Sequence, residues 1–174
     1  MLRSDPPRRV PRPAAPASQG DANALALWEN QAVLVFRHQA FVPAPVPQVW
    51  ELIGHPQRHP EWWPELVEVQ GERFGRGCSY CHVTQDERGL NEMTLIVERV
   101  TELKELAVRC DQNGLYMRWL LSDAQGGTLV DAEFGLDPTK ASAPSPEFNR
   151  EAAKSDLERW LRASLDGLAN ARLP

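Results

Sequence analysis

The sequence predicts an α+β domain in which a curved, seven-stranded antiparallel sheet wraps around one long C-terminal helix. Two observations carry this prediction. From residue 66 the chain breaks into short runs rich in β-branched and aromatic residues, with turn signals about every ten residues. After the last run, apolar residues recur at helical spacing almost to the C-terminus.

The N-terminal segment differs in composition from the rest of the chain. Residues 1–22 hold five of the fifteen prolines and four arginines, with no aromatic residue. Because so little apolar surface is available for burial, we expect a disordered tail. Residues 23–30 are expected to form a short helix or a linker, and residues 31–172 a single domain.

The domain is predicted to start with a strand over residues 32–42, followed by two short helical segments. The strand ends at three prolines in alternate positions, Pro43, Pro45 and Pro47. Pro47 suits the first turn of a helix, because the N–H that proline lacks has no partner there. Three further prolines break the helical segment expected over residues 55–66, which its two tryptophans anchor.

Six more strands are predicted, over residues 66–74, 78–86, 93–101, 105–111, 115–123 and 128–137. Several of them alternate apolar with polar residues, as Val130, Ala132 and Phe134 do with Asp131 and Glu133. Successive side chains of a strand point to opposite faces of the sheet. One face should therefore be covered and the other solvated.

The last helix is predicted to cover that apolar face. Ser145, Pro146 and Glu147 combine a good N-cap, a proline in the first turn and an acidic residue near the start. The apolar stripe that follows comprises Phe148, Ala152, Leu157, Trp160, Leu161, Leu165 and Leu168. We expect a helix of about 25 residues.

This order of elements, together with local motifs, resembles the START-like (SRPBCC) superfamily and its polyketide cyclase/dehydrase-like branch. The motifs are VPAPVPQVWELI at 42–53, HPEWWP at 59–64, Gly75 and Gly77, IVERV at 96–100, and LSDAQGGTLV at 121–130. The resemblance covers about residues 31–171. It implies the Bet v 1-like helix-grip fold, with two short helices after the first strand and a cavity between sheet and helix. The superfamily includes carriers, aromatase/cyclases, oxygenase domains and chaperone activators, so it implies no single function.

The cavity implied by the resemblance would be lined by the inward face of the strands and by the last helix. The predicted ligand-binding residues are Phe36, His38, Tyr80, His82, Val108, Met117, Trp119, Phe134, Trp160 and Leu161. Trp62 and Trp63 are predicted to flank its entrance. The alternative is that most of these side chains only fill the core.

Three polar residues of this set are the candidate catalytic residues. Imidazole titrates near neutral pH, so His38 and His82 would serve as acid or base and would share the cavity if both face inward. Tyr80, two residues from His82, would supply a hydrogen bond. The alternative is that each histidine is satisfied by a neighbouring protein group. No carboxylate is expected beside them, because parity assigns to the outer face Glu98, Asp131 and Glu133.

Residues 78–82 read Cys-Ser-Tyr-Cys-His, the spacing of covalent haem attachment. On a strand, however, Cys78 and Cys81 point to opposite faces, so we interpret the pattern as coincidental. No second Cys/His pair has zinc-ligand spacing. Surface or capping roles are assigned to His55 and His59, and we expect no metal and no cofactor.

Composition restricts the partners. A net charge of −5 argues against a nucleic acid or an anionic membrane surface. No run approaches the ~18 apolar residues of a membrane span, and no secretory signal is evident, so a cytoplasmic location is expected. The three cysteines are expected to be reduced. The oligomeric state has no signature in the sequence.

The sequence therefore favours a carrier or sensor that binds a hydrophobic or aromatic small molecule, lipid- or polyketide-like, in an internal cavity. The first alternative is a polyketide cyclase/aromatase-like enzyme that uses histidine and tyrosine in the cavity. An interaction module akin to chaperone activators is another. A c-type haem protein is the remote alternative.

Overall fold

The computed structural model describes residues 33–87, 89–142 and 149–173. The predicted tail and the segment at 23–30 lie outside these residues. Of the described elements, the first half comprises β1 (Leu34–Val42), α2 (Val46–Ile53), the 3-10 helix η1 (Pro56–Glu61), β2 (Leu66–Gln70), β3 (Ser79–Asp86) and β4 (Gly89–Thr101). The second half comprises β5 (Glu105–Cys110), β6 (Leu115–Ala124), β7 (Gly127–Leu136), the 3-10 helix η2 (Pro138–Lys140) and α3 (Arg150–Ala169).

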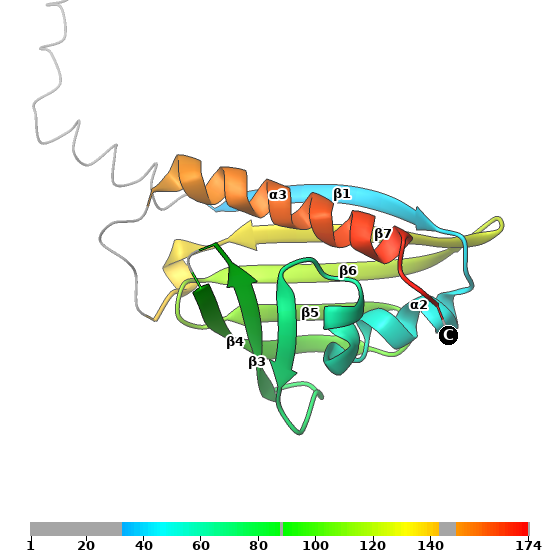
Figure 1. The fold of residues 1–174 in the computed structure, drawn as a ribbon, viewed down its shortest axis with the longest axis horizontal. Helices are drawn as coiled ribbons and strands as arrows, with labels where there is room; N and C mark the ends of the chain where they lie inside the picture. The colour runs from blue at the N-terminus through cyan, green and yellow to red at the C-terminus, as the bar shows by residue number, and fades with distance from the viewer. Residues whose placement is uncertain (1–32, 88, 143–148, 174) are drawn as a thin grey trace, which may run out of the picture. The chain divides into compact units, whose positions relative to one another are not determined.

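The seven strands form one antiparallel sheet in the order β1-β7-β6-β5-β4-β3-β2. Strands β2 to β7 form a meander, and β1 pairs with β7 from Leu34–Leu136 to Val42–Thr128. The register shifts between Leu66 and Glu68 and between Val97 and Arg99. Such irregularities bend a strand and increase its twist. The predicted seven-stranded α+β fold with a C-terminal helix is confirmed (Figure 1).

Helix α3 packs on β1 and β7 and covers the inner face of that part of the sheet (Figure 1). The helix buries four leucines of the predicted stripe, Leu157, Leu161, Leu165 and Leu168. On the sheet side, Leu106, Trp119 and Phe134 are fully buried. Each such side chain contributes about 1.5–3 kcal/mol when it leaves water. The core thus lies between the sheet and α3, as the alternation of the strands predicts.

Helix α3 begins later than the sequence predicts. It starts at Arg150 and has 20 residues, and its N-cap is Asn149, whose side-chain oxygen accepts a hydrogen bond of 3.1 Å from the backbone N–H of Ala152. Asn149 has extended backbone angles (φ −98°, ψ 103°), so no helix runs through it. The predicted start at Ser145 is therefore wrong. Residues 145–148 lie outside the described part of the chain.

Two strand boundaries differ from the prediction by four residues. β2 ends at Gln70 rather than at residue 74, and its last pair with β3 is Gln70–Cys81. Gly71, which follows, packs closely against Tyr80, where a Cβ atom would lie 2.8 Å from the Tyr80 Cβ. β4 begins at Gly89 rather than at residue 93, because its pairing with β3 continues to the end of the hairpin. Pairing between strands, which a single run cannot reveal, sets this limit.

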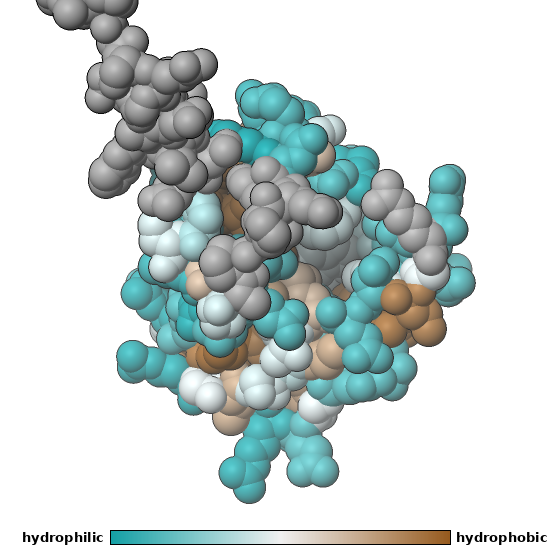
Figure 2. Space-filling view, turned by 90° about the vertical axis from the view of Figure 1, so that its left-hand side faces the viewer, coloured by the Kyte–Doolittle hydropathy of each residue, from teal (hydrophilic) through white to brown (hydrophobic). Residues whose placement is uncertain are grey.

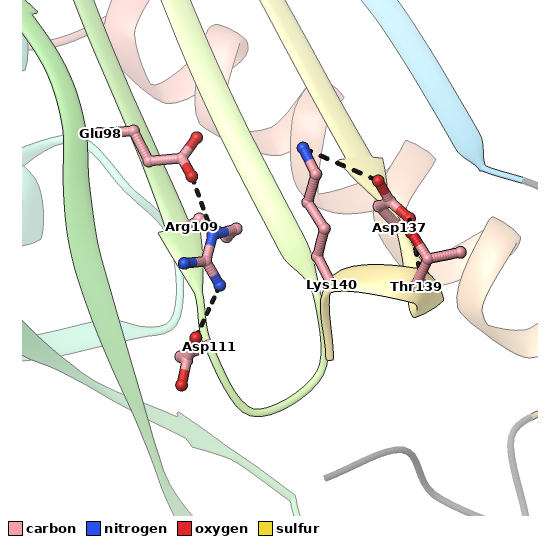
Figure 3. Close-up of polar contacts among 6 residues, drawn as sticks. All are labelled: Glu98, Arg109, Asp111, Asp137, Thr139 and Lys140. Carbon is pink, nitrogen blue, oxygen red and sulfur yellow. Dashed lines mark hydrogen bonds and ion pairs between the residues drawn. The ribbon is translucent and has the colours of Figure 1, made fainter. Parts of the chain in front are cut away.

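The outer face of the sheet carries ion pairs that connect neighbouring strands. Arg37 Nε lies 2.5 Å from a carboxylate oxygen of Glu133. Arg109 bridges Glu98 and Asp111, with 2.8 Å to an oxygen of each (Figure 3).

Near the end of β7, the side chain of Asp137 accepts a hydrogen bond from the Thr139 N–H and lies 3.8 Å from Lys140 Nζ (Figure 3). Figure 2 shows the molecule from another side, where hydrophilic residues also cover much of the surface. Of the helices described, none has the length and apolar character needed to cross a bilayer.

Candidate functional site

A buried group of aromatic and histidine side chains lies where η1 packs against the inner face of the sheet. His59 of η1 is its centre, with ring centroids 5.3–6.5 Å from five neighbouring rings. The histidine–aromatic cluster, as we call it, consists of His59, Trp62, Trp63, Tyr80, His82, Trp119 and Phe134. Its members come from η1 and the residues after it, and from β3, β6 and β7.

The proline-rich segment places His59 and the two tryptophans in the cluster. Pro60 within η1 has no N–H to donate, and the helix ends one residue later. The backbone N–H groups of Trp62 and Trp63 both donate to the His59 carbonyl, at 3.1 and 2.8 Å. Trp62 Nε1 donates to the Leu52 carbonyl of α2 at 3.1 Å. These backbone hydrogen bonds and the side-chain hydrogen bond of Trp62 thus hold the segment in place where proline cannot donate.

His59 and His82 form a buried hydrogen-bonded pair. Nδ1 of His59 lies 3.2 Å from Nε2 of His82, and Nε2 of His59 lies 2.9 Å from the carbonyl oxygen of Ile53. Neither residue is more than 1% exposed. Burial lowers the pKa of His59 to about 4, against the smaller opposing effect of the Ile53 hydrogen bond. Burial, and then the neighbouring His59, lower the pKa of His82 well below its ordinary value. Both imidazoles are therefore neutral at pH 7.

Two hydrogen-bond donors of the cluster have no protein partner among the described residues. They are the hydroxyl of Tyr80 and the indole Nε1–H of Trp119. A buried polar group without a partner costs about 1–3 kcal/mol, and most such groups in proteins are paired. Burial also raises the pKa of Tyr80, so its hydroxyl keeps its proton. The cluster can thus donate two hydrogen bonds to a neutral acceptor.

The structure brings together part of the predicted site. Tyr80, His82, Trp119 and Phe134 all lie in the cluster, and the neighbouring strands bury Val108 and Met117. Leu161 of α3 is buried as well, whereas Phe36 and Trp160 are only half-buried.

His38 lies far from His82 in the sheet. Four strands separate β1, which carries His38, from β3. Its side chain is 31% exposed, with Nε2 4.0 Å from a carboxylate oxygen of Glu158 on α3. The two histidines that the sequence singles out therefore do not form a pair, and His59 is the residue that His82 contacts.

Trp62 and Trp63 are both buried, with exposed fractions of 4% and 8%. Their rings stack at 5.6 Å, and Trp63 also packs against Phe134. Outside them lies a surface groove of about 540 Å³, lined by residues 60–64 and by Gly167, Asn170, Ala171 and Arg172. The two tryptophans thus form the inner wall of this groove, between solvent and the other members of the cluster.

The assignment of His59 to the surface is wrong, because its ring is fully buried. The capping alternative is confirmed, because Nε2 of His59 donates to the carbonyl oxygen of Ile53, the last residue of α2. A signal for the burial was present in the sequence. His59, Trp62 and Trp63 are spaced i, i+3 and i+4, which places side chains on the same side of a helical turn. If the two tryptophans are buried, the histidine on the same side of the turn is buried as well.

The cysteines near the cluster do not converge with its histidine. Cys78 precedes β3, and Cys81 lies on the face of β3 opposite to His82. Both are half-buried and free, and Cys110 is buried and free. Among the described residues, no group of three or more His, Cys, Asp or Glu side chains is arranged to hold a metal ion.

Comparison with known proteins identifies the family of this chain. The family model described as "Polyketide cyclase / dehydrase and lipid transport" matches residues 34–171. None of the curated protein sequences matches the chain.

Several solved structures share the fold. The Zhui aromatase/cyclase from Streptomyces sp. R1128 has 17% identity and a TM-score of 0.64, over 79% of this chain and 92% of that one. Ara h 8.0201 has 14% identity and a TM-score of 0.54, over 79% and 98%. The di-domain protein BexL from the BE-7585A biosynthetic pathway has 16% identity and a TM-score of 0.63, over 87% of this chain and 54% of BexL. At these identities the likeness establishes the helix-grip fold, and the family match over most of the sequence establishes that the chain belongs to the polyketide cyclase / dehydrase and lipid transport family.

Proposed function

We propose that this protein binds an uncharged, aromatic or otherwise apolar small molecule against the inner face of its sheet, at the histidine–aromatic cluster. One observation carries the proposal: Tyr80 and Trp119 hold buried donors that no described protein group satisfies. A ligand carbonyl oxygen would accept one or both hydrogen bonds and relieve that cost. Binding sites of this kind combine a mostly apolar lining with a few oriented polar groups.

The electrostatics of the site support a neutral ligand. His59 and His82 are both neutral at pH 7. Among the described residues, Glu105 is the one buried carboxylate, and on the outer face it accepts hydrogen bonds from Arg99 at 3.2 Å and Arg118 at 2.7 Å. An ion that entered the cluster would lose its hydration without meeting a counter-charge.

Replacement of Tyr80 by Phe should have opposite effects on stability and binding. The ligand-free protein should be stabilised by about 1 kcal/mol, because the change removes an unsatisfied buried hydroxyl and keeps the ring. Binding of a carbonyl compound should weaken about tenfold, because its hydrogen bond is lost. Urea denaturation measures the first effect and titration calorimetry with 9-fluorenone the second.

The ligand and the protein each offer a matched control. Fluorene has the shape of fluorenone without the carbonyl, so Y80F should leave its affinity unchanged. Tyr116 is the other tyrosine of the chain and lies on the outer face, and Y116F should preserve fluorenone binding. If wild-type protein bound fluorene as tightly as fluorenone, the proposed role of Tyr80 and Trp119 would be refuted.

A second candidate function is catalysis of an aldol-type ring closure, and the His59–His82 pair is the observation that favours it. A neutral imidazole can remove a proton from a carbon between two carbonyl groups, and a nearby tyrosine hydroxyl can stabilise the resulting enolate. Tyr80 lies next to His82, with ring centroids 5.2 Å apart.

The catalytic candidate predicts faster proton exchange in a diketone probe. With dibenzoylmethane in D₂O, the wild-type protein should accelerate deuterium uptake at the central carbon, measured by NMR, and H82F should abolish the acceleration. H38F is the control and should retain it, because His38 lies four strands away. Exchange at the buffer rate in the presence of wild-type protein would leave binding as the function.

A further inference from the structure

We infer that His59 is a positioning residue, which holds His82 in the tautomer that leaves a lone pair on Nδ1 of His82. Resting on the proposed function, this deepens it by defining the ligand class: a neutral molecule that carries a hydroxyl donor beside its carbonyl acceptor.

The chain of hydrogen bonds starts at a group with fixed polarity. The carbonyl oxygen of Ile53 can only accept, and it lies 2.9 Å from Nε2 of His59. That nitrogen must therefore carry a hydrogen. A neutral imidazole has one N–H, so Nδ1 of His59 is an acceptor.

The tautomer of His59 then determines which nitrogen of His82 carries the hydrogen. Nδ1 of His59 accepts across 3.2 Å from Nε2 of His82, which must carry the hydrogen. In neutral His82 the remaining nitrogen, Nδ1, holds a lone pair. The reverse tautomer of His82 would bring two lone pairs together at this distance inside a fully buried pair.

Charged forms of the pair are disfavoured by the surroundings. The rings packed around the two histidines are Trp62, Trp63, Tyr80 and Trp119, and none of them bears a charge. Burial also lowers the pKa of both imidazoles. The neutral, directional arrangement is therefore the stable one.

The anchor of the chain is the end of a helix. Ile53 is the last residue of α2, where helical carbonyl groups carry partial negative charge. The carbonyl thus orients His59, and through it His82, in the way that a carboxylate orients a histidine in other sites. The pair consequently needs no buried acid.

The site then offers both hydrogen-bond polarities side by side. Tyr80 and His82 are two residues apart on the inner face of β3, with ring centroids 5.2 Å apart. The Tyr80 hydroxyl donates and Nδ1 of His82 accepts. Phenolic or enolic ketones match this combination, whereas simple hydrocarbons match neither half.

Nitrogen-15 NMR of histidine-labelled, ligand-free protein tests the tautomer directly. In the wild-type protein at pH 7, His82 should give a protonated Nε2 and an unprotonated Nδ1, with assignment by comparison with H82F. H59F should produce a mixture of both tautomers, because the ring remains and the acceptor is lost. H59N should restore the single tautomer, because the carboxamide oxygen can take the place of Nδ1. A proton on Nδ1 of His82 in the wild type would overturn the inference.

The ligand class is tested with a matched pair, fluorenone and 1-hydroxyfluorenone, whose hydroxyl stands beside the carbonyl. The wild-type protein should prefer the hydroxylated compound about tenfold, and both H59F and H82F should lose the preference. Equal affinities in the wild type would overturn the assignment of Nδ1 as the ligand's acceptor. Failure of the wild type to bind either compound would contradict the proposed function instead, while the NMR result, obtained without ligand, stands separately.

Discussion

Acidification from pH 7 to pH 4 should destabilise the fold strongly, because the protein buries His59 and His82 in their neutral forms. The pKa of His59 is about 4 in the folded protein, against an ordinary value of 6.5. Between these values the unfolded chain binds more protons, so stability is fully present above about pH 6.5 and is lost as the pH falls. His59 alone should account for about 3 kcal/mol at pH 4. His82 acts in the same direction.

The measurement is the free energy of unfolding in urea at several pH values between 7.5 and 4. The double variant H59F/H82F should have a shallower dependence, because the protons that only the unfolded state binds are removed. H55Q is the control, since His55 is exposed and its loss should leave the slope unchanged. Identical slopes for the wild type and the double variant would show that the pair is not buried in neutral form.

Substitution of Gly167 by Ala should destabilise the protein by about 2 kcal/mol or more, although alanine is ordinarily the better helix former. Gly167 lies in α3, and a Cβ atom there would overlap the carbonyl oxygen of Trp62 and approach Pro64 Cδ to 3.4 Å. Because the first obstacle is backbone, the segment after η1 must move away from the helix. That movement would shift Trp62 and Trp63 and with them the wall of the cluster.

The same urea denaturation measures this loss, and fluorenone titration should show weaker binding in G167A. D166A is the matched control, because Asp166 is the exposed neighbour on the same helix and alanine is compatible with its environment. It should be neutral or slightly stabilising. A G167A protein as stable as the wild type would mean that α3 and Trp62 are not in close contact.

The fold was predictable because its signals are local. Alternation along β7 and the apolar stripe of α3 each report which face is buried, and glycine turns delimit the strands. The start of α3 was not predictable in the same way. Ser145 and Asn149 are both good N-caps, and the choice between them depends on tertiary structure.

The site was predictable only in part. Strand parity placed Tyr80, His82 and Trp119 on the inner face, and the structure gathers all three. Strand parity could not predict the contact between His82 and His59. That contact joins η1 to β3, and nothing in the residues between them shows how the chain brings the two together. Parity also put His38 on the inner face, yet it cannot measure distance across a sheet, and four strands separate the two positions.

The stacked pair Trp62–Trp63 provides an intrinsic optical signal for the position of these two rings. Two indole rings with centroids 5.6 Å apart and an interplanar angle of 26° are close enough for their electronic transitions to couple. Such coupling produces a split band in far-ultraviolet circular dichroism, where the strongest indole transition lies, and the band disappears when the rings separate. Opening of the wall between the groove and the cluster is therefore visible by optical spectroscopy in the unlabelled protein.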